Sequence, residues 1–281
     1  MRSVDVSGMK NLRMFYVFGG CPELTSVNLG RAVNLQFLGW PDEFGGGEYP
    51  DICTMESLEV LGLGHGETKT PRDLHGRLDF CRSSNLEFLG LSSLPLNLLN
   101  LNQAVQLREL VVRDCQHLER FDGLEALVKL EDIMLGHCSS LLELPSLVNF
   151  PCLKAFALTG AAKLREIQGF SSLTGLQQLM LEVGEELEEL PRIEACTRLT
   201  LLILSSTSIG DCSWISMMKD LTLICLSGTK IRSVPDCSGL IKLCELWLVN
   251  CPALESLGNS LGIPKRFPKA YRCSVRRIVE G

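Results

Sequence analysis

Aromatic residues are scarce in this chain, at 6% of its 281 residues, whereas hydrophobic residues make up 46%. A protein with so few large rings must build its core mainly from aliphatic side chains, and leucine recurs throughout the sequence. The apolar content is ample for a packed core. We therefore expect a folded protein whose interior consists mostly of leucine.

An excess of basic residues is also missing, because 33 acidic residues outnumber 27 lysines and arginines and give a formal net charge of −6. Proteins that bind nucleic acid usually carry a basic excess, so we expect no nucleic-acid partner. The one basic cluster lies in residues 265–281, which we interpret as a basic C-terminal tail. It contains Lys265, Arg266, Lys269, Arg272, Arg276 and Arg277.

Long apolar runs are absent, so the sequence predicts no transmembrane helix and no membrane contact. The first residues lead into no apolar segment of the kind that a secretory signal needs. The 13 cysteines are odd in number and form no C-x-x-C pair, which favours neither a disulfide framework nor a zinc site. These features together predict a cytoplasmic protein without a bound metal.

A repeat of the form L-x-x-L-x-L dominates what is present. It recurs eleven times at spacings of 21 to 28 residues, most often 23, across residues 1–264. Its first leucines are Leu12, Leu35, Leu58, Leu86, Leu107, Leu130, Leu153, Leu176, Leu199, Leu221 and Leu243. Counted from these leucines, apolar residues occupy offsets 0, 3, 5, 11 and 14 of the clearest units. So regular a period predicts one repeat array over residues 1–264.

Offsets 2 to 5 alternate between outward and inward positions, which is typical of a short strand with one buried face. A single such strand cannot bury its apolar side, but stacked coils pair their strands into a parallel sheet. We therefore expect an α/β leucine-rich-repeat solenoid, a curved horseshoe with the sheet on its concave face and an irregular or short-helical outer wall. Val4 and Val6 before Ser7-Gly8 resemble a strand and its turn, so we expect the chain to start inside the array.

Offset 8 favours a small residue that can donate a hydrogen bond where the chain turns off the strand. Cysteine or threonine stands there in several units, and we interpret these cysteines as structural. The donors are Cys115, Cys138, Thr207, Thr229 and Cys251, whereas Gly66, Ala161 and Gly184 cannot donate.

Several units resemble the repeats of plant intracellular nucleotide-binding leucine-rich-repeat disease-resistance proteins. Leu130–Pro145 and Leu221–Pro235 carry that family's L-x-L-x-x-C/T-x-x-L-x-x-L-P pattern, and Leu187–Pro191 matches its ending. The family's nucleotide-binding domain is missing, and no G-x-x-x-x-G-K-[ST] motif is present. The resemblance implies a cytosolic receptor's recognition region without its nucleotide switch, as a fragment or as a stand-alone repeat protein.

That resemblance implies a protein partner, either a pathogen effector, a host protein or the missing nucleotide-binding domain. The alternative is a stand-alone cytosolic adaptor or scaffold, for example in a ubiquitin ligase or signalling complex. We expect no enzyme and no cofactor, because neither a catalytic Ser/His/Asp or Cys/His arrangement nor a cofactor fingerprint is found.

Residues at offsets 2 and 4 should face away from the core, and here they are unusually apolar, which is typical of an interaction surface. We predict that Tyr16, Phe37 and Phe88 anchor a protein ligand near the amino end. A second predicted cluster consists of Met134, Met180 and Trp247. The alternatives are contact with a missing neighbouring domain, or no role at all.

Overall fold

The structure is a computed structural model that describes residues 3–17, 23–24, 26–30, 32–40, 52, 55–64, 77–79 (backbone only), 84–183 and 192–255. The basic tail at 265–281, the motif at residues 187–191, Gly66 and Gly184 lie outside this described part. The chain divides into two compact units, unit 1 from Met1 to Pro145 and unit 2 from Ser146 to Gly281.

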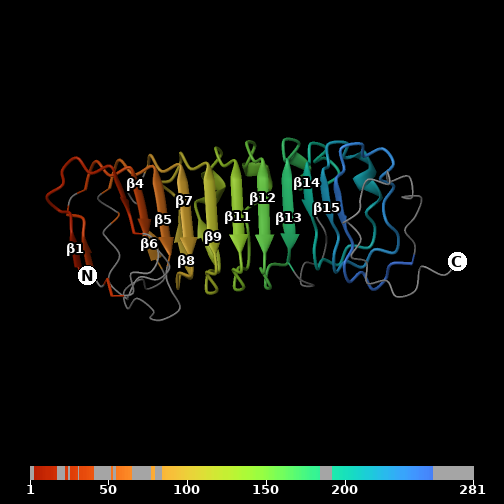
Figure 1. Cartoon of the computed structure of the whole chain (residues 1–281), viewed down its shortest axis with the longest axis horizontal. Coiled ribbons are helices and arrows are strands. Elements are labelled where there is room, and N and C mark those ends of the chain that lie inside the picture. The colour runs from red at the N-terminus through yellow and green to blue at the C-terminus, as the bar shows by residue number, and fades with distance from the viewer. Residues whose placement is uncertain are drawn as a thin grey trace. The chain divides into compact units, whose positions relative to one another are not determined.

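Unit 1 contains a main ladder of parallel strands, one from each coil (Figure 1). Consecutive strands pair in register, for example Leu110 of β9 with Ile133 of β11. The strands of this ladder are β2 (Met14–Tyr16), β4 (Phe37–Trp40), β5 (Val60–Gly64), β7 (Phe88–Ser92), β9 (Glu109–Arg113) and β11 (Asp132–Gly136). Each strand begins at offset 2 of its repeat, as the leucine period predicts.

Unit 2 contains a ladder built on the same plan. Its neighbouring strands are again parallel, with Leu179 opposite Phe156 on one side and opposite Leu202 on the other. The strands are β12 (Ala155–Thr159), β13 (Gln178–Glu182), β14 (Leu201–Ile203), β15 (Leu223–Cys225) and β16 (Glu245–Trp247). Each unit is therefore a stretch of leucine-rich-repeat solenoid, which confirms the predicted fold class.

The core of each unit consists of the inward leucines of successive coils. Leu86, Leu89 and Leu91 of one coil are at most 1% exposed, and so are Leu107 and Leu110 of the next. Full burial of one such side chain stabilises a fold by roughly 1.5–3 kcal/mol. The repeat thus stabilises each coil through its immediate neighbours.

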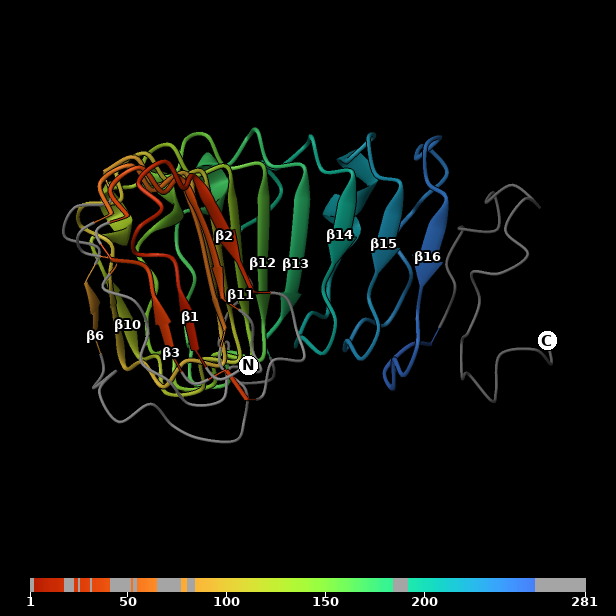
Figure 2. The ribbon, with the colours of Figure 1, turned by 60° about the vertical axis from the view of Figure 1, so that its left-hand side comes forward.

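Short helices and further strands complete the coils. The 3-10 helices that lie entirely within the described residues are η2 (Leu124–Ala126) in unit 1 and η3 (Leu147–Asn149), η4 (Phe170–Ser172) and η5 (Ser213–Met217) in unit 2. Unit 1 also carries two small parallel ladders that the sequence did not predict, visible apart from the main ladder in Figure 2. They pair β1 (Ser3–Asp5) with β3 (Ser26–Asn28), and β8 (Leu98–Asn100) with both β6 (Arg77–Asp79) and β10 (Arg120–Asp122). The strand at Ser3–Asp5 confirms that Val4 belongs to a strand, whereas Val6 lies outside it.

The chain leaves most strands through a left-handed residue at offset 7. Such a backbone suits glycine and, less well, asparagine, aspartate, histidine and serine. In unit 1 the backbone N–H of this left-handed residue continues the hydrogen bonding between strands. The N–H of Asp114, for example, donates to the carbonyl of Gly136 at 2.8 Å. The residues concerned are Ser93, Asp114, His137, Gly160, Ser206, Gly228 and Asn250.

The predicted donors at offset 8 follow directly and are buried. The Thr229 hydroxyl donates to the carbonyl of Leu226 at 2.6 Å, and the Thr207 hydroxyl donates to that of Leu204 at 3.1 Å. The thiol of Cys138 lies 3.6 Å from the carbonyl of Gly136. The structural interpretation of this position is therefore confirmed.

Candidate protein-binding face

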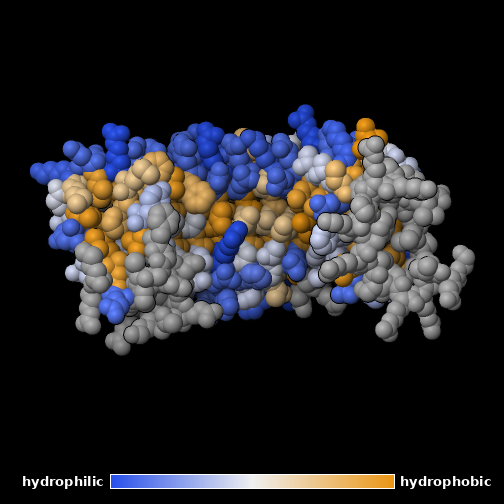
Figure 3. Space-filling model, in the orientation of Figure 1, coloured by the Kyte–Doolittle hydropathy of each residue, from blue (hydrophilic) through white to orange (hydrophobic). Residues whose placement is uncertain are grey.

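The outward residues of the main ladder form two parallel rows in unit 1, which we call the ladder face of unit 1. One row continues through the strands at offset 2 and the other at offset 4, because the partners in each pair of strands are in register. The offset-2 row consists of Met14, Phe37, Val60, Phe88, Glu109 and Asp132, and the offset-4 row of Tyr16, Gly39, Gly62, Gly90, Val111 and Met134. Figure 3 shows this face as an apolar band below a hydrophilic margin where the strands begin.

The three residues predicted near the amino end come close together on this face. Phe37 and Phe88 lie in the same row, separated only by Val60. Tyr16 lies in the adjoining row, opposite Gly39 of β4. The structure thus places all three within three strand spacings, or roughly 15 Å.

Three glycines occupy successive positions of the offset-4 row and differ in what covers them. The ring of Tyr16 lies over Gly39, and the ring of Phe88 comes within 3.0 Å of where a Cβ on Gly90 would lie. At Gly62, between them, such a Cβ would meet no atom of the described residues within 4 Å. The face therefore has an opening at Gly62, with the ring of Tyr16 from β2 over Gly39 of β4 on one side and the ring of Phe88 from β7 on the other.

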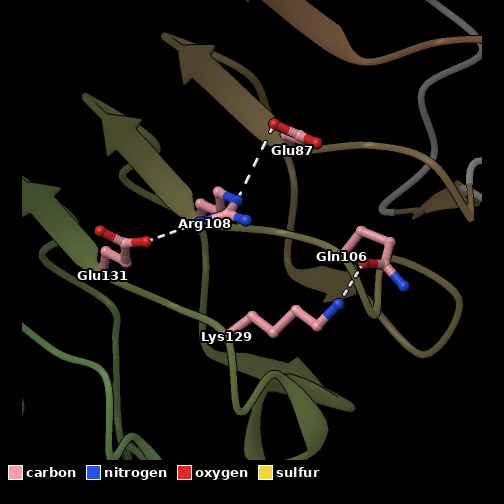
Figure 4. Close-up of polar contacts among 5 residues, drawn as sticks. All are labelled: Glu87, Gln106, Arg108, Lys129 and Glu131. Atoms are coloured by element: carbon pink, nitrogen blue, oxygen red, sulfur yellow. Dashed lines mark hydrogen bonds and ion pairs between the residues drawn. The ribbon is translucent and has the colours of Figure 1, made fainter.

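The hydrophilic margin in unit 1 is a chain of polar contacts between successive coils. Arg108 lies between two carboxylates, with its Nη1 2.7 Å from Glu131 Oε1 and its Nε 3.9 Å from Glu87 Oε2 (Figure 4). On the same edge, the ammonium group of Lys129 donates a hydrogen bond to the side-chain carbonyl of Gln106. Because Arg108 and Glu87 are more than half exposed and Glu131 is partly exposed, each ion pair stabilises the fold by at most about 1 kcal/mol.

A shallow groove of about 320 Å³ lies at the same edge, near the first coils. Its lining is polar and consists of Asn11, Arg13, Asn34, Gln36 and Ser57. The amide of Asn34 donates to the Lys10 carbonyl, and that of Gln36 donates to Glu59. This groove extends the polar margin next to Tyr16 and Phe37.

The second predicted cluster is divided between the two units. Met134 belongs to unit 1, where its sulfur accepts a contact from Arg113 Nη2 at 2.8 Å. Met180 and Trp247 belong to the offset-4 row of unit 2, with Ile203 and Cys225 between them. These two residues therefore share a row without touching, and the structure does not gather the cluster at one point.

Unit 2 also turns apolar residues outward on its ladder. Leu201, Ile203 and Leu223 are half-buried, and Trp247 is 45% exposed. The indole Nε1 of Trp247 donates to Glu245 Oε2 at 2.8 Å, which holds the ring beside its own strand. Both units thus present an apolar ladder face with few aromatic residues.

Several buried cysteines of the described part lack the features of a reactive site. Burial raises the pKa of the Cys115 thiol to about 11 and that of Cys138 to about 12. Burial also raises the pKa of Cys212 to about 12. A protonated, buried thiol is a poor nucleophile at neutral pH. Within the described residues, no group of three or more His, Cys, Asp or Glu is placed to hold a metal ion.

The sequence interpretation missed the importance of the glycine row and of the polar margin. Both signals were present, because Gly39, Gly62 and Gly90 share offset 4, and offset 1 is polar in successive coils. Glycine in a strand interior often marks a place where a ligand or another backbone approaches closely.

No family model matches the sequence, and a search of curated proteins found no relative. Solved structures do resemble the fold. The functional domain of InlJ from Listeria monocytogenes, described as including a cysteine ladder, is 17% identical with a TM-score of 0.71 over 89% of this chain. The internalin InlF from the same organism is 16% identical, with a TM-score of 0.60 over 90% of this chain and 76% of its own length.

The plant peptide hormone receptor RGFR1, solved in complex with RGF2, is 19% identical with a TM-score of 0.50. That match covers 84% of this chain and 47% of the receptor chain. The chain likewise spans only 52% of the length of the InlJ domain. At such identities the resemblance establishes the leucine-rich-repeat fold, which is typical of protein-interaction modules. No helix among the described residues has the length and apolar character needed to cross a membrane.

Proposed function

We propose that this chain is a protein-recognition module that binds its partner through the ladder faces. The observation that carries this proposal is the exposure of large apolar side chains along the strands. Met14 is 57% exposed, Tyr16 38% and Trp247 45%. Exposed apolar patches are typical of interaction sites, and aromatic residues and methionine are enriched at interface cores.

In finer terms, we propose the recognition region of a plant-type intracellular immune receptor, acting in the cytoplasm without catalysis or cofactor. The L-P endings and the Cys/Thr turns of Leu130–Pro145 and Leu221–Pro235 support this assignment. The Cys and Thr residues of these motifs are buried at offset 8, where they donate to backbone carbonyls. The partner would be a pathogen effector, a host protein or a nucleotide-binding domain, and neither nucleic acid nor a membrane is part of the proposal.

The binding proposal can be tested with a photo-crosslinking residue, p-benzoylphenylalanine, placed at Tyr16 or Trp247. Control positions are Val128 and Ile241, which are exposed but lie outside the strands. In extracts of infected plant tissue, protein adducts from the ladder positions alone would support the proposal. Equal adducts from all four positions, or none from the ladder positions, would contradict it.

The receptor assignment has a separate test. The transcript upstream of the Met1 codon should encode a nucleotide-binding domain with a G-x-x-x-x-G-K-[ST] motif, or the crosslinked partner should be such a domain or an effector. Crosslinking to a ubiquitin-ligase or kinase component, with no such motif upstream, would instead identify an adaptor.

A further inference from the structure

The opening at Gly62 leaves strand backbone accessible to a side chain from outside, as far as the described residues show. Its floor is the backbone of β5, and the rings that cover or flank the neighbouring glycines belong to Tyr16 and Phe88. Val60 and Phe37 continue the apolar surface in the adjoining row. A residue without a Cβ weakens a strand, so a glycine that no described side chain covers gives space to an outside group at a cost in stability.

Charge on this part of the face is predominantly acidic. Arg108 is already held between Glu87 and Glu131, and Arg113 contacts the sulfur of Met134. The carboxylate of Glu109 makes no hydrogen bond or ion pair within the described residues, although it lies directly opposite Phe88 in the offset-2 row. Five carboxylates accompany three cationic groups on the strands from β5 to β11 and on the edge where these strands begin. They are Glu59, Glu87, Glu109, Glu131 and Asp132, against Arg108, Arg113 and Lys129.

We propose that a partner protein inserts a large apolar side chain of an extended segment into the opening at Gly62, and that a lysine or arginine of the same segment pairs with Glu109. This inference rests on the proposed function, and it specifies the chemistry of the partner. The acidic excess selects a basic segment over an acidic one, because opposite charge at an interface rim favours association and like charge opposes it.

The distance between the two points sets the spacing of the recognised residues. Glu109 lies two strands from Gly62 and two residues back along the strand, which corresponds to ~12 Å. An extended peptide advances about 3.3 Å per residue. The apolar and basic residues of the partner segment should therefore be three or four positions apart.

The first experiment selects peptides of a random 12-residue phage library on the purified full chain. Enriched peptides should share a large apolar residue three or four positions from a lysine or arginine. Enrichment of acidic residues in place of basic ones would overturn the inference.

Variants of the chain then test the two contacts with the most enriched peptide, labelled with fluorescein. Gly62→Leu should weaken binding by about tenfold or more, because it fills the opening. The matched control is Gly210→Leu, in unit 2, where a Cβ also meets nothing within 4 Å. Gly62→Thr provides a second variant with a residue well suited to strands, and both Gly62 variants should melt no lower than the wild type.

Glu109→Gln should weaken binding and reduce its dependence on salt, whereas Glu119→Gln, outside the strands, should leave both unchanged. Unchanged binding to Gly62→Leu and Gly62→Thr would overturn the inference. So would a wild-type dimer that Gly62→Leu converts to a monomer, because the occupant would then be a second copy of the chain. If no peptide is enriched but the crosslinker at Tyr16 still captures a protein, this inference fails and the proposed binding function stands. If the crosslinkers at Tyr16 and Trp247 also give no adduct, the inference and the proposed binding function both fail.

Discussion

The ring of Tyr16 lies over the Cα of Gly39 on the neighbouring strand. A Cβ added to Gly39 would come within 2.8 Å of Tyr16 Cε1. The ring can lie against the sheet because Gly39, 23 residues further along the sequence, has no side chain. The position of an aromatic anchor thus depends on the residue type in the next coil.

Replacement of Gly39 by alanine should displace the Tyr16 ring and change little else. The ring is the far end of a side chain that can rotate, and alanine is favoured over glycine in a strand by roughly 0.5–1 kcal/mol, so the unfolding free energy should stay the same or rise slightly. Ring resonances of Tyr16 in ¹³C-tyrosine-labelled protein would report the displacement. Gly62→Ala, which meets no atom within 4 Å, is the control and should leave them in place. Identical spectra for the two variants would contradict the contact.

Removal of the Thr229 hydroxyl should destabilise unit 2. Thr229→Val keeps the shape of the side chain but removes the buried hydroxyl that donates to the Leu226 carbonyl, which then keeps only the weak thiol donor of Cys251 at 3.2 Å, a loss of about 1 kcal/mol. Thr222 also donates to a backbone carbonyl, but at an exposed position, so Thr222→Val should have a smaller effect. Urea unfolding of both variants measures the difference, and equal losses would show that burial of the hydroxyl is unimportant.

The left-handed backbone at His137 should make this position sensitive to β-branched residues. His137 has φ +53°, where a valine side chain is strained, so His137→Val should lower the unfolding free energy by about 1 kcal/mol. Glycine at the same position should be tolerated. His117 is also exposed and lacks a positive φ, so His117→Val is the matched control. A similar loss in both variants would argue against backbone strain as the cause.

Alkaline pH should destabilise the fold through its buried thiols. Burial raises the pKa of Cys138 from 9.0 to about 12 and that of Cys115 from 9.0 to about 11. A folded-state pKa above the unfolded value gives stability that is complete below about pH 9 and declines as the pH rises towards the folded pKa, because the unfolded chain releases the proton first. Urea midpoints between pH 7 and 11, in the presence of a reductant, should fall above pH 9. Cys138→Thr, a residue that the chain itself uses at offset 8, should make the decline shallower; an unchanged slope would contradict this assignment.

Alkylation of the folded protein should distinguish two groups of cysteines. Cys152 and Cys244 are exposed, whereas Cys115, Cys138 and Cys196 are buried. Iodoacetamide at pH 8 should modify the first group within minutes and the second only after unfolding, since both access and the thiolate form are needed. Mass spectrometry of tryptic peptides would assign the sites. Modification of Cys138 in the folded protein at the rate of Cys152 would be incompatible with the packed turn.

The main ladders could be predicted from the sequence because the leucine period is strong and local. Strands such as β9 and β13 begin where offset 2 places them. The small ladders of unit 1 could not be predicted in this way. Leu98–Asn100 and Arg120–Asp122 are three residues long and lie outside the L-x-x-L-x-L segment, and so short an alternation does not by itself distinguish a strand from a turn.

The candidate face was predictable only as a list of outward positions. The period placed Tyr16, Phe37 and Phe88 on the strands, but it did not show that a ring covers Gly39 while Gly62 stays open. Those contacts depend on rotamers and on neighbours one coil away. The left-handed position at offset 7 had a usable signal, because residues such as Asp114, Gly160 and Asn250 are the types that tolerate a positive φ.

Because the ladder of unit 1 is in register, the distance between Gly62 and Glu109 can change only by whole strand spacings when coils are gained or lost. One coil, that of β7, lies between their strands, so a duplication or loss of that coil would change the separation by one strand spacing of about 4.8 Å. Coils interact mainly with their neighbours, so such a change leaves the rest of the stack intact. The spacing between the two ligand residues that the face recognises would then change in evolution by whole strand spacings.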